Sequence, residues 1–423
     1  MTVTIALGLQ WGDEGKGKMV DYLSETADLV IRAAGGANAG HTIVNNDKKY
    51  ILHHLPSGLI HAHARAYLAS GMVIDPFSLL KEIKGIEQQG LSDLRNRIQI
   101  SPAAHLILPW HRDLEKIREK SPGAIGTTLK GIGPAYESRA SRKGLPLALL
   151  KYPDLLKQKL SSIFQEFAPF FEKFEVSVDS VDEVHAQLLQ VAREIVPLLG
   201  DLQPLLDKYI QPDDNNEIIL EGAQGALLDI NHGTYPYVTS SSTISGGLLS
   251  GTGIGPLKID KAVGIMKAYT TRVGNGPFPT EIQGKAGEKM GKIGGEFGAT
   301  TGRPRRCGWL DLVALKYAVN LTGVKDLVIT KIDVLSDFEK VKVCTAYKLP
   351  DGTSSSFFPE DPWILEKCRP VYKTFPSWNI SGSLTVDNID PALQAFIDMI
   401  EKYTGARVSF LSWGPQRHKT LRV

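Results

Sequence analysis

The sequence predicts an α/β fold in which a large, mostly parallel central sheet carries helices on both faces. Short apolar runs rich in β-branched residues alternate with segments of helical spacing, which is the pattern of a covered parallel sheet. Polar, glycine-rich segments follow many of these runs, where open α/β sheets bind their ligands. With 423 residues, 42% of them hydrophobic, we expect one large catalytic domain over residues 1–423.

The first strand is expected at residues 3–8, because VTIALG is continuously apolar, and a helix follows the glycine-rich loop after it. The helix expected at 76–90 opens with Pro and closes with Gly. Further strands are expected at 28–34, 97–100, 326–333 and 407–415, and further helices at 308–323 and 391–405. Residues 217–230 predict a strand followed by a glycine turn, and residues 261–273 a strand that runs into a loop. Residues 154–210 are amphipathic and poor in glycine, so they predict a helical insertion within the domain.

Composition and cysteine usage exclude several classes of protein. A net charge of +2 argues against a sequence-independent nucleic-acid binder or a membrane-surface protein. Cys307, Cys344 and Cys368 lack C-x-x-C spacing, which favours neither a zinc site nor a disulfide framework. The chain shows neither a secretory signal pattern nor an apolar run of about 20 residues. We therefore expect a cytoplasmic enzyme without membrane or nucleic-acid partners.

A phosphate-binding loop is predicted in GLQWGDEGKGKMVD, residues 8–21. Gly12, Gly17 and Lys18 fit the G-x-x-x-x-G-K pattern, which makes the fold P-loop NTPase-like, but Met19 replaces the hydroxyl residue that normally binds magnesium. Asp13 is the nearest carboxylate to take over as a metal ligand. An acid inside a phosphate cradle is costly unless it binds a cation or removes a proton, so we expect a chemical role for Asp13.

GGANAGH, residues 35–41, places Asn38 and His41 in a loop after the second expected strand. Histidine is the usual general acid near neutral pH, although most of the ten histidines here will be structural or exposed. TKID, residues 330–333, ends a buried strand: its carboxylate, Asp333, can accept N1–H and the amine of guanine, and the stem of Lys331 can lie along the base. Together with the phosphate loop, this short motif favours GTP over ATP.

Arginine-bearing glycine loops indicate additional anionic ligands, although a basic loop is more often a solvated surface. The loop at 299–309 suits a dicarboxylate or a phosphate, and the segment 127–144 suits a second phosphate. The residues concerned are Thr300, Thr301, Arg303, Arg305 and Arg306 in the first, and Thr128 and Arg142 in the second. Gln224 and Thr239 add amide and hydroxyl donors. These observations define a GTP-using enzyme with two other anionic ligands, and leave open a GTP-binding switch or a simple nucleotide kinase.

Taken together, the motifs resemble the adenylosuccinate synthetase family, in order and over essentially the whole chain. They are QWGDEGKGK, NAGHT, GIGPAYE, EGAQG, NHGTYPYVTSS, TTRVGNGPFPTE, TTGRPRRCGWLD and TKIDVL. The chain departs from the family pattern at Leu129 and Lys130, where the family commonly has Gly and a basic residue. The resemblance implies a Mg²⁺-dependent ligase of purine biosynthesis that joins IMP and L-aspartate at the expense of GTP, through 6-phosphoryl-IMP.

The resemblance also implies the role of each site residue. Asp13 would be the general base on N1 of IMP, His41 the acid at the departing phosphoryl group, and Asp13 and Gly40 the magnesium ligands. The implied GTP site comprises Gly12, Glu14, Gly15, Lys16, Gly17, Lys18, Gly40, His41, Thr42, Arg305, Lys331, Ile332, Asp333, Ser412, Trp413 and Gly414. The implied IMP site comprises Asp13, Glu14, Gly15, Lys16, Asn38, Ala39, Gly40, His41, Thr128, Arg142, Gln224, Thr239 and Arg303. Ala299, Thr300, Thr301, Gly302, Arg303, Pro304 and Arg305 would receive aspartate, and Arg142 would reach the neighbouring site of a homodimer.

Overall fold

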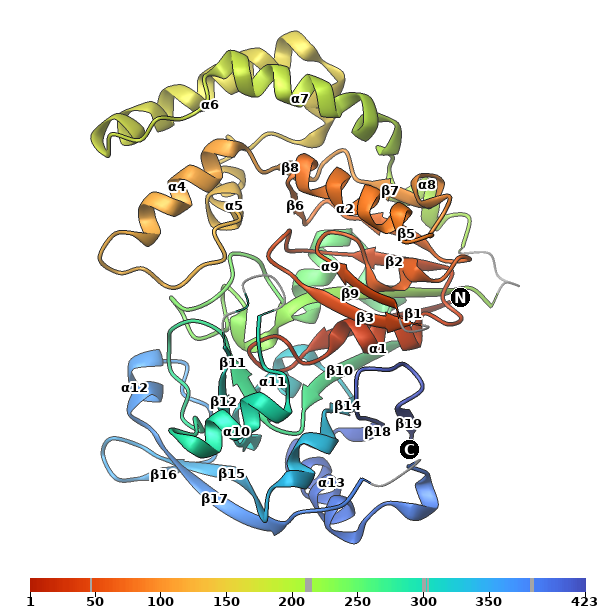
Figure 1. Ribbon diagram of the computed structural model, residues 1–423, viewed down its shortest axis with the longest axis vertical. Coiled ribbons are helices and arrows are strands. Elements are labelled where there is room, and N and C mark those ends of the chain that lie inside the picture. The colour runs from red at the N-terminus through yellow and green to blue at the C-terminus, as the bar shows by residue number, and fades with distance from the viewer. Residues whose placement is uncertain (46–47, 210–214, 299–301, 303, 381–383) are drawn as a thin grey trace.

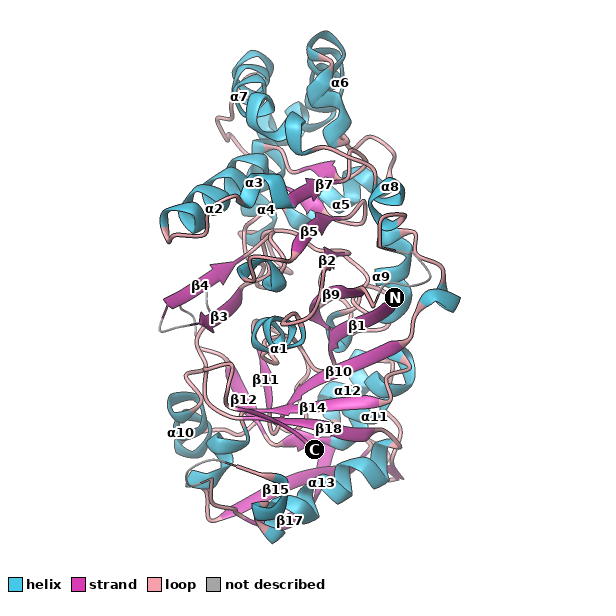
Figure 2. Cartoon of the chain, turned by 90° about the vertical axis from the view of Figure 1, so that its right-hand side faces the viewer, coloured by secondary structure: helices cyan, strands magenta, loops and turns pink. Residues whose placement is uncertain are grey.

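The computed structural model describes residues 1–45, 48–209, 215–298, 302, 304–380 and 384–423. A nine-stranded sheet runs through the middle of the molecule (Figures 1 and 2). In spatial order its strands are β19 (Thr420–Arg422), β18 (Arg407–Ser412), β14 (Asp326–Thr330), β10 (Lys261–Lys267), β1 (Thr2–Gly8), β9 (Glu217–Gly225), β2 (Leu29–Arg32), β5 (Arg65–Leu68) and β7 (Ile98–Ile100). All neighbours pair in parallel except β19, which is antiparallel to β18. The predicted fold class is confirmed.

Helices lie on both sides of this sheet. Alternate residues of its strands accordingly belong to different apolar clusters. Ile5 and Leu7 of β1 belong to the large core that includes the helices α9, α11 and α13, whereas Ala6 belongs to the core beneath α1. The thirteen helices among the described residues are α1 (Lys16–Leu23), α2 (Pro76–Gln88), α3 (Leu94–Arg97), α4 (Pro109–Glu119), α5 (Ile132–Ala140), α6 (Pro153–Lys173), α7 (Val181–Ile195), α8 (Leu202–Leu206), α9 (Ser245–Thr252), α10 (Lys285–Ile293), α11 (Leu312–Thr322), α12 (Pro362–Lys367) and α13 (Pro391–Thr404).

Smaller sheets flank the central one. They are the hairpin β3 (His41–Asn45) with β4 (Lys48–Leu52), the pair β6 (Val73–Ile74) with β8 (His105–Leu106), the pair β11 (Thr270–Arg272) with β12 (Arg306–Gly308), and the sheet of β13 (Leu310–Asp311), β15 (Lys340–Lys348), β16 (Ser354–Ser355) and β17 (Arg369–Pro376). The helix expected at 308–323 begins only at Leu312. Residues 310–311 are a strand, and the Asp311 carboxylate caps the helix by accepting the N–H of Ala314 at 3.1 Å.

The helices α6 and α7 form one end of the molecule, next to α4 and α5 (Figure 1). They lie within the segment 154–210 except that α6 starts at Pro153, and their apolar faces share one core with α2, α4 and the strands β5 and β7. The description of the chain as one catalytic domain with a helical insertion stays a prediction. No described helix combines the length and apolarity that crossing a bilayer requires.

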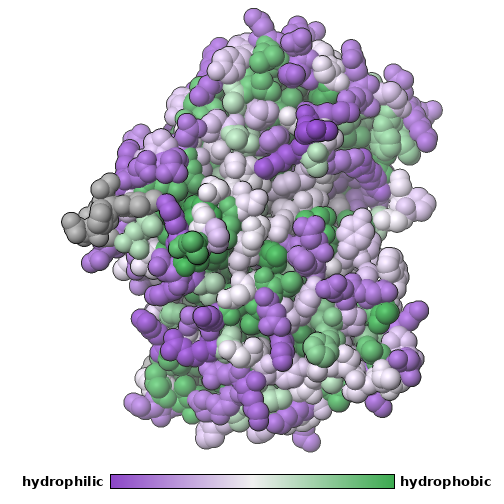
Figure 3. Space-filling model, turned by 180° about the vertical axis from the view of Figure 1, so that it is seen from behind, coloured by the Kyte–Doolittle hydropathy of each residue, from purple (hydrophilic) through white to green (hydrophobic). Residues whose placement is uncertain are grey.

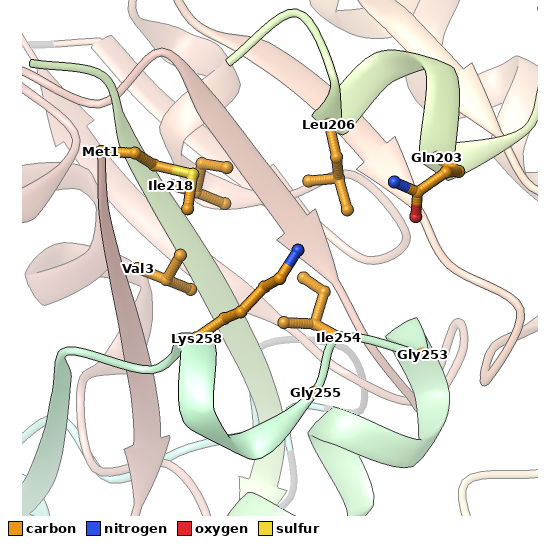
Figure 4. A pocket seen from close by; sticks show the side chains of 9 residues that line it. All are labelled: Met1, Val3, Gln203, Leu206, Ile218, Gly253, Ile254, Gly255 and Lys258. Atoms are coloured by element: carbon orange, nitrogen blue, oxygen red, sulfur yellow. The ribbon is translucent and has the colours of Figure 1, made fainter. Parts of the chain in front are cut away.

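The surface and the cavities give little separate indication of function. Figure 3 shows hydrophilic side chains over the two ends of one face, with paler and apolar residues across its middle. A cavity of about 40 Å³ lies beside the first residues of β1 and β9, lined by Met1, Val3, Ile218 and Lys258 among others (Figure 4). That volume suffices for one or two waters. Because it sits at the opposite edge of the sheet from the glycine-rich loops, it is not the nucleotide site.

Candidate active site

The predicted site residues gather at the carboxyl edge of the parallel sheet. The strands β1, β2, β9, β14 and β18 are parallel, so the segments that follow them start at the same edge. The expectation that polar, glycine-rich segments follow strands is wrong for two such segments. Residues 239–255 contain α9, and residues 298–306 lead from α10 into β12. Tertiary packing nevertheless brings both to the site, through Thr239 and Arg305.

The phosphate loop is shaped from within by Glu14. Its fully buried carboxylate accepts the N–H groups of Gln10 and Gly12 at 3.1 and 2.8 Å and pairs with Lys16 Nζ at 2.5 Å. Met19 faces the other way, into the apolar core beneath α1. The position that usually supplies a metal-binding hydroxyl therefore serves packing in this chain.

Asp13 has a left-handed backbone (φ 61°), and its carboxylate remains one-third exposed. Its Oδ2 atom lies 2.6 Å from Nε of Arg305, whose Nη1 in turn contacts Glu296 at 2.7 Å. Burial lowers the pKa of Arg305, but the two carboxylates raise it more, so the guanidinium stays charged. The sequence had placed Arg305 against substrates, whereas here it also holds the expected base.

The carboxylate of Glu296 pairs with several cationic side chains, and the sequence did not lead us to expect this residue in the site. This buried carboxylate pairs with Lys267 at 2.8 Å and with Lys331 at 3.1 Å, as well as with Arg305, and accepts the hydroxyl of Tyr269. Burial alone would raise the pKa of Glu296, but the three cations lower it far below its usual value. Lys267, which directly follows the apolar run AVGIM of β10, was the sequence signal that could have indicated such a pair.

The segment expected to bind guanine lies against the C-terminal loop. Lys18 Nζ donates to the carbonyls of Trp413, Gly414 and Lys419, and burial lowers the pKa of Lys18 to about 7, with Asp333 opposing that shift. Asp333 Oδ2 accepts the N–H of Gly414 at 3.1 Å. Its Oδ1 is buried and has no partner among the described residues. A buried, unpaired carboxylate oxygen is expected where a ligand supplies the donor.

Unpaired polar atoms also mark the expected IMP side. Within the described residues, both side-chain polar atoms of Gln224 and the Oδ1 of Asn38 are buried without a partner. Asn38 Nδ2 donates to Thr239 Oγ1 at 3.4 Å, and Gln224 lies close enough to Gly12 and Gly35 that a side chain at Gly35 would contact it. Gln224, like Asp13, has a left-handed backbone (φ 55°). The structure thus brings Asn38, Thr239 and Gln224 together beside the phosphate loop.

Other predicted residues are placed differently. Ala299, Thr300, Thr301 and Arg303 lie outside the described residues, between Glu296 and β12. A cavity of about 310 Å³ borders that gap and is lined by Glu296, Phe297, Pro304 and Arg305 among others. Leu129 adopts a left-handed backbone (φ 57°), at the position where the family commonly has Gly. Arg142 is exposed beyond the carboxyl end of α5, whereas Gly133, at the other end of that helix, approaches Ser240.

A parallel sheet with a phosphate loop, a buried carboxylate with an unpaired oxygen and additional polar clusters at one edge is the arrangement of an α/β enzyme that uses a nucleoside triphosphate. Comparisons with known proteins identify the family of this enzyme. The sequence model of the family described as adenylosuccinate synthetase matches residues 5–421, and the chain belongs to this family. Adenylosuccinate synthetase of Thermodesulfovibrio yellowstonii is 45% identical over 425 residues, covering 100% of this chain and 99% of its own.

Two further comparisons agree. The chain is 46% identical to the adenylosuccinate synthetase of Chlorobium chlorochromatii, over 99% of this chain and 96% of that protein. The solved structure of the fully ligated adenylosuccinate synthetase of Plasmodium falciparum is 36% identical and superposes with a TM-score of 0.93 over the whole of both chains. The chain is thus a ligase of purine biosynthesis that joins IMP and L-aspartate at the expense of GTP, giving adenylosuccinate, GDP and phosphate through 6-phosphoryl-IMP.

Proposed function

We propose that Asp13 removes the proton from N1 of IMP and that His41 steadies the γ-phosphoryl group that GTP transfers to O6. The carbonyl C6 of hypoxanthine is a poor electrophile, and an oxide is a poor leaving group. Loss of the N1 proton makes O6 nucleophilic, and phosphorylation of O6 creates a group that the amine of aspartate can displace. The observation that carries this proposal is the one-third-exposed carboxylate of Asp13 within the phosphate loop itself.

The ligand sites that we propose follow from these positions. The loop amides of residues 12–18 and residues 40–42 hold the phosphates of GTP, and Arg305, residues 331–333 and residues 412–414 surround its guanine nucleotide. The unpaired atoms of Asn38 and Gln224 support an IMP site there, completed by residues 13–16, Ala39, Thr128, Thr239 and Arg303. Aspartate is assigned to residues 299–305, where Arg305 supplies a charged fork for one carboxylate.

Magnesium is assigned to the carboxylate of Asp13 and the backbone carbonyl of Gly40. Among the described residues, no group of three or more histidine, cysteine or acidic side chains could hold a metal. That fits Mg²⁺, which is usually held by one or two protein oxygens together with phosphates and water. When bound, the ion neutralises charge on the phosphates. Asp13 would then exchange its contact with Arg305 for the ion and IMP, and Arg305 would keep its pair with Glu296.

Arg142 is assigned to the neighbouring subunit of a homodimer. The nine-residue helix α5 is about 13 Å long, and its first turn is the end that approaches Ser240, so Arg142 lies far from that contact in its own chain. We expect Arg142→Leu and Asp13→Asn to be inactive alone. Mixing their subunits should restore up to about a quarter of the wild-type activity, since half of the dimers would carry one intact site. Absence of recovery despite subunit exchange would argue against a shared site.

The reaction is tested by supplying GTP, Mg²⁺, IMP and aspartate together, then omitting each in turn while adenylosuccinate absorbance is followed. The ligase needs all four components. GDP formed at the full rate without aspartate would indicate a nucleotide kinase, and slow GTP hydrolysis that is indifferent to IMP would indicate a switch.

A further inference from the structure

A buried acid–imidazole pair lies beneath the phosphate loop. Nδ1 of His41, the first residue of β3, contacts Oε1 of Glu221 on β9, and both side chains are buried. His41 also packs on the first turn of α1, because a Cβ added at Gly17 would lie 2.9 Å from the Cβ of His41. The imidazole is therefore held between the loop that receives phosphate and a carboxylate from the central sheet.

Donors from a separate turn fix Glu221. The backbone N–H of Ser57, in the short helical turn Ser57–Ile60, donates to Oε2 at 2.7 Å, and its hydroxyl donates to Oε1 at 3.0 Å. Arg32 is the register neighbour of Glu221 on β2, and its Nη1 lies 3.7 Å from Oε1. The three guanidinium nitrogens of Arg32 have no hydrogen-bond partner among the described residues. Glu221 is thus oriented by Ser57 and faces one full positive charge.

These contacts determine the protonation of the pair. Burial raises the pKa of Glu221, but His41, Arg32 and Ser57 together lower it below its usual value. Burial lowers the pKa of His41, as do Arg32 and Lys16, while Glu221 opposes them. An ionised carboxylate can only accept, so the proton on the imidazole is at Nδ1. Nε2 is therefore the ring nitrogen opposite the contact with Glu221.

We propose that Glu221 is the positioning residue of His41: by accepting the Nδ1–H it fixes the orientation of the ring, so that Nε2 is the nitrogen presented to the departing phosphoryl group. This rests on the proposed role of His41. The alternative is that Glu221 merely neutralises the buried Arg32, in which case its effect would not depend on the imidazole.

A double-mutant cycle separates the two roles. Glu221→Gln keeps the size of the side chain but removes its charge, and we expect kcat to fall by about 10²–10³-fold, within the range of a general acid. In an H41N background the same substitution should lower kcat by less than about threefold, because the group on which Glu221 acts is already gone. The KM values for GTP and IMP should move less than kcat in both backgrounds.

Glu82→Gln is the matched control. Glu82 is also a buried carboxylate that faces an imidazole, that of His54 at 3.3 Å, and it accepts backbone N–H groups from His53 and Leu55. Any loss that it causes should be the same in both backgrounds. An equal loss for Glu221→Gln in both backgrounds, or no loss at all, would overturn the proposal. Unaltered kcat in H41N alone would instead refute the role of His41.

A second measurement uses the wild-type protein and does not depend on whether a Glu221 variant folds. Nitrogen NMR of wild-type protein labelled at histidine, with the His41 signal assigned by its absence in H41N, reports which ring nitrogen carries the proton. The proposal predicts a proton on Nδ1 both without ligand and with a non-hydrolysable GTP analogue and Mg²⁺. A neutral ring with the proton on Nε2 in either state would contradict it.

Discussion

The substitution Asp333→Asn should change the preferred base from guanine to xanthine. In the structure Oδ2 of Asp333 accepts the N–H of Gly414, and Oδ1 is buried and free. An asparagine can keep the Gly414 contact with its oxygen, and its NH₂ then replaces the free acceptor. Guanine, which offers N1–H and an amine, loses the hydrogen bond to the charged Oδ1 acceptor, worth about 1.5–3 kcal/mol, and meets an N–H donor in its place. This loss corresponds to roughly 10–10² in kcat/KM for GTP.

The assay is kcat/KM for GTP and for xanthosine triphosphate, with IMP and aspartate saturating. The kcat/KM of the variant for xanthosine triphosphate should rise, because the amide of the asparagine can donate to the extra carbonyl of xanthine. Asp326→Asn is the matched control, because Asp326 begins the strand that Asp333 follows and pairs with Arg407 at 3.2 Å, at the opposite edge of the sheet. If the ratio of the two values does not change in Asp333→Asn, Asp333 does not contact the base.

Three further outcomes are expected. Gly17→Ala should lower kcat by about 10–100-fold with little loss of stability, measured by thermal unfolding, because its Cβ would displace His41 from the first turn of α1. GTP binding near pH 8.5 should take up about one proton more in wild-type protein than in Lys18→Met, measured by calorimetry in two buffers. The pKa of Lys18 is lowered to about 7, so the amine is neutral at that pH until the bound phosphate restores its charge. Leu129→Gly should raise the free energy of unfolding by about 0.5–1 kcal/mol in urea denaturation, since Leu129 is partly exposed with φ 57°.

The central sheet was predictable because its strands contain continuous apolar runs. Residues 3–8 and 326–330 have the continuous hydrophobicity of strands buried on both faces, and the structure has strands there. The sheet of β15 and β17 was missed although Lys340–Lys348 alternates between buried and exposed residues over much of its length. Its pairing joins segments about 30 residues apart, whereas the tight turn LPDGT at residues 349–353 pairs β15 with the two-residue strand β16 instead.

The residues of the site also fall into two groups, those that a local sequence pattern indicates and those that it does not. Asp13, His41 and Asp333 stand in loops whose glycines and polar residues are visible in the sequence. Glu221 and Glu296 act through partners 180 and 29 residues away, so no local pattern contains both members of either pair. A glutamate within the buried strand 217–225 was nevertheless a usable signal, because a fully buried glutamate is rare unless it is paired.

Proton removal by Asp13 is the central step of the proposed mechanism, and single-turnover formation of adenylosuccinate by Asp13→Asn tests it directly. Asparagine has nearly the same size but cannot take up the N1 proton. With GDP affinity measured separately to verify the loop, we predict a rate lower by at least about 10²-fold, the smallest effect typical of a general base. A variant that forms adenylosuccinate at the wild-type rate would show that another group removes the proton.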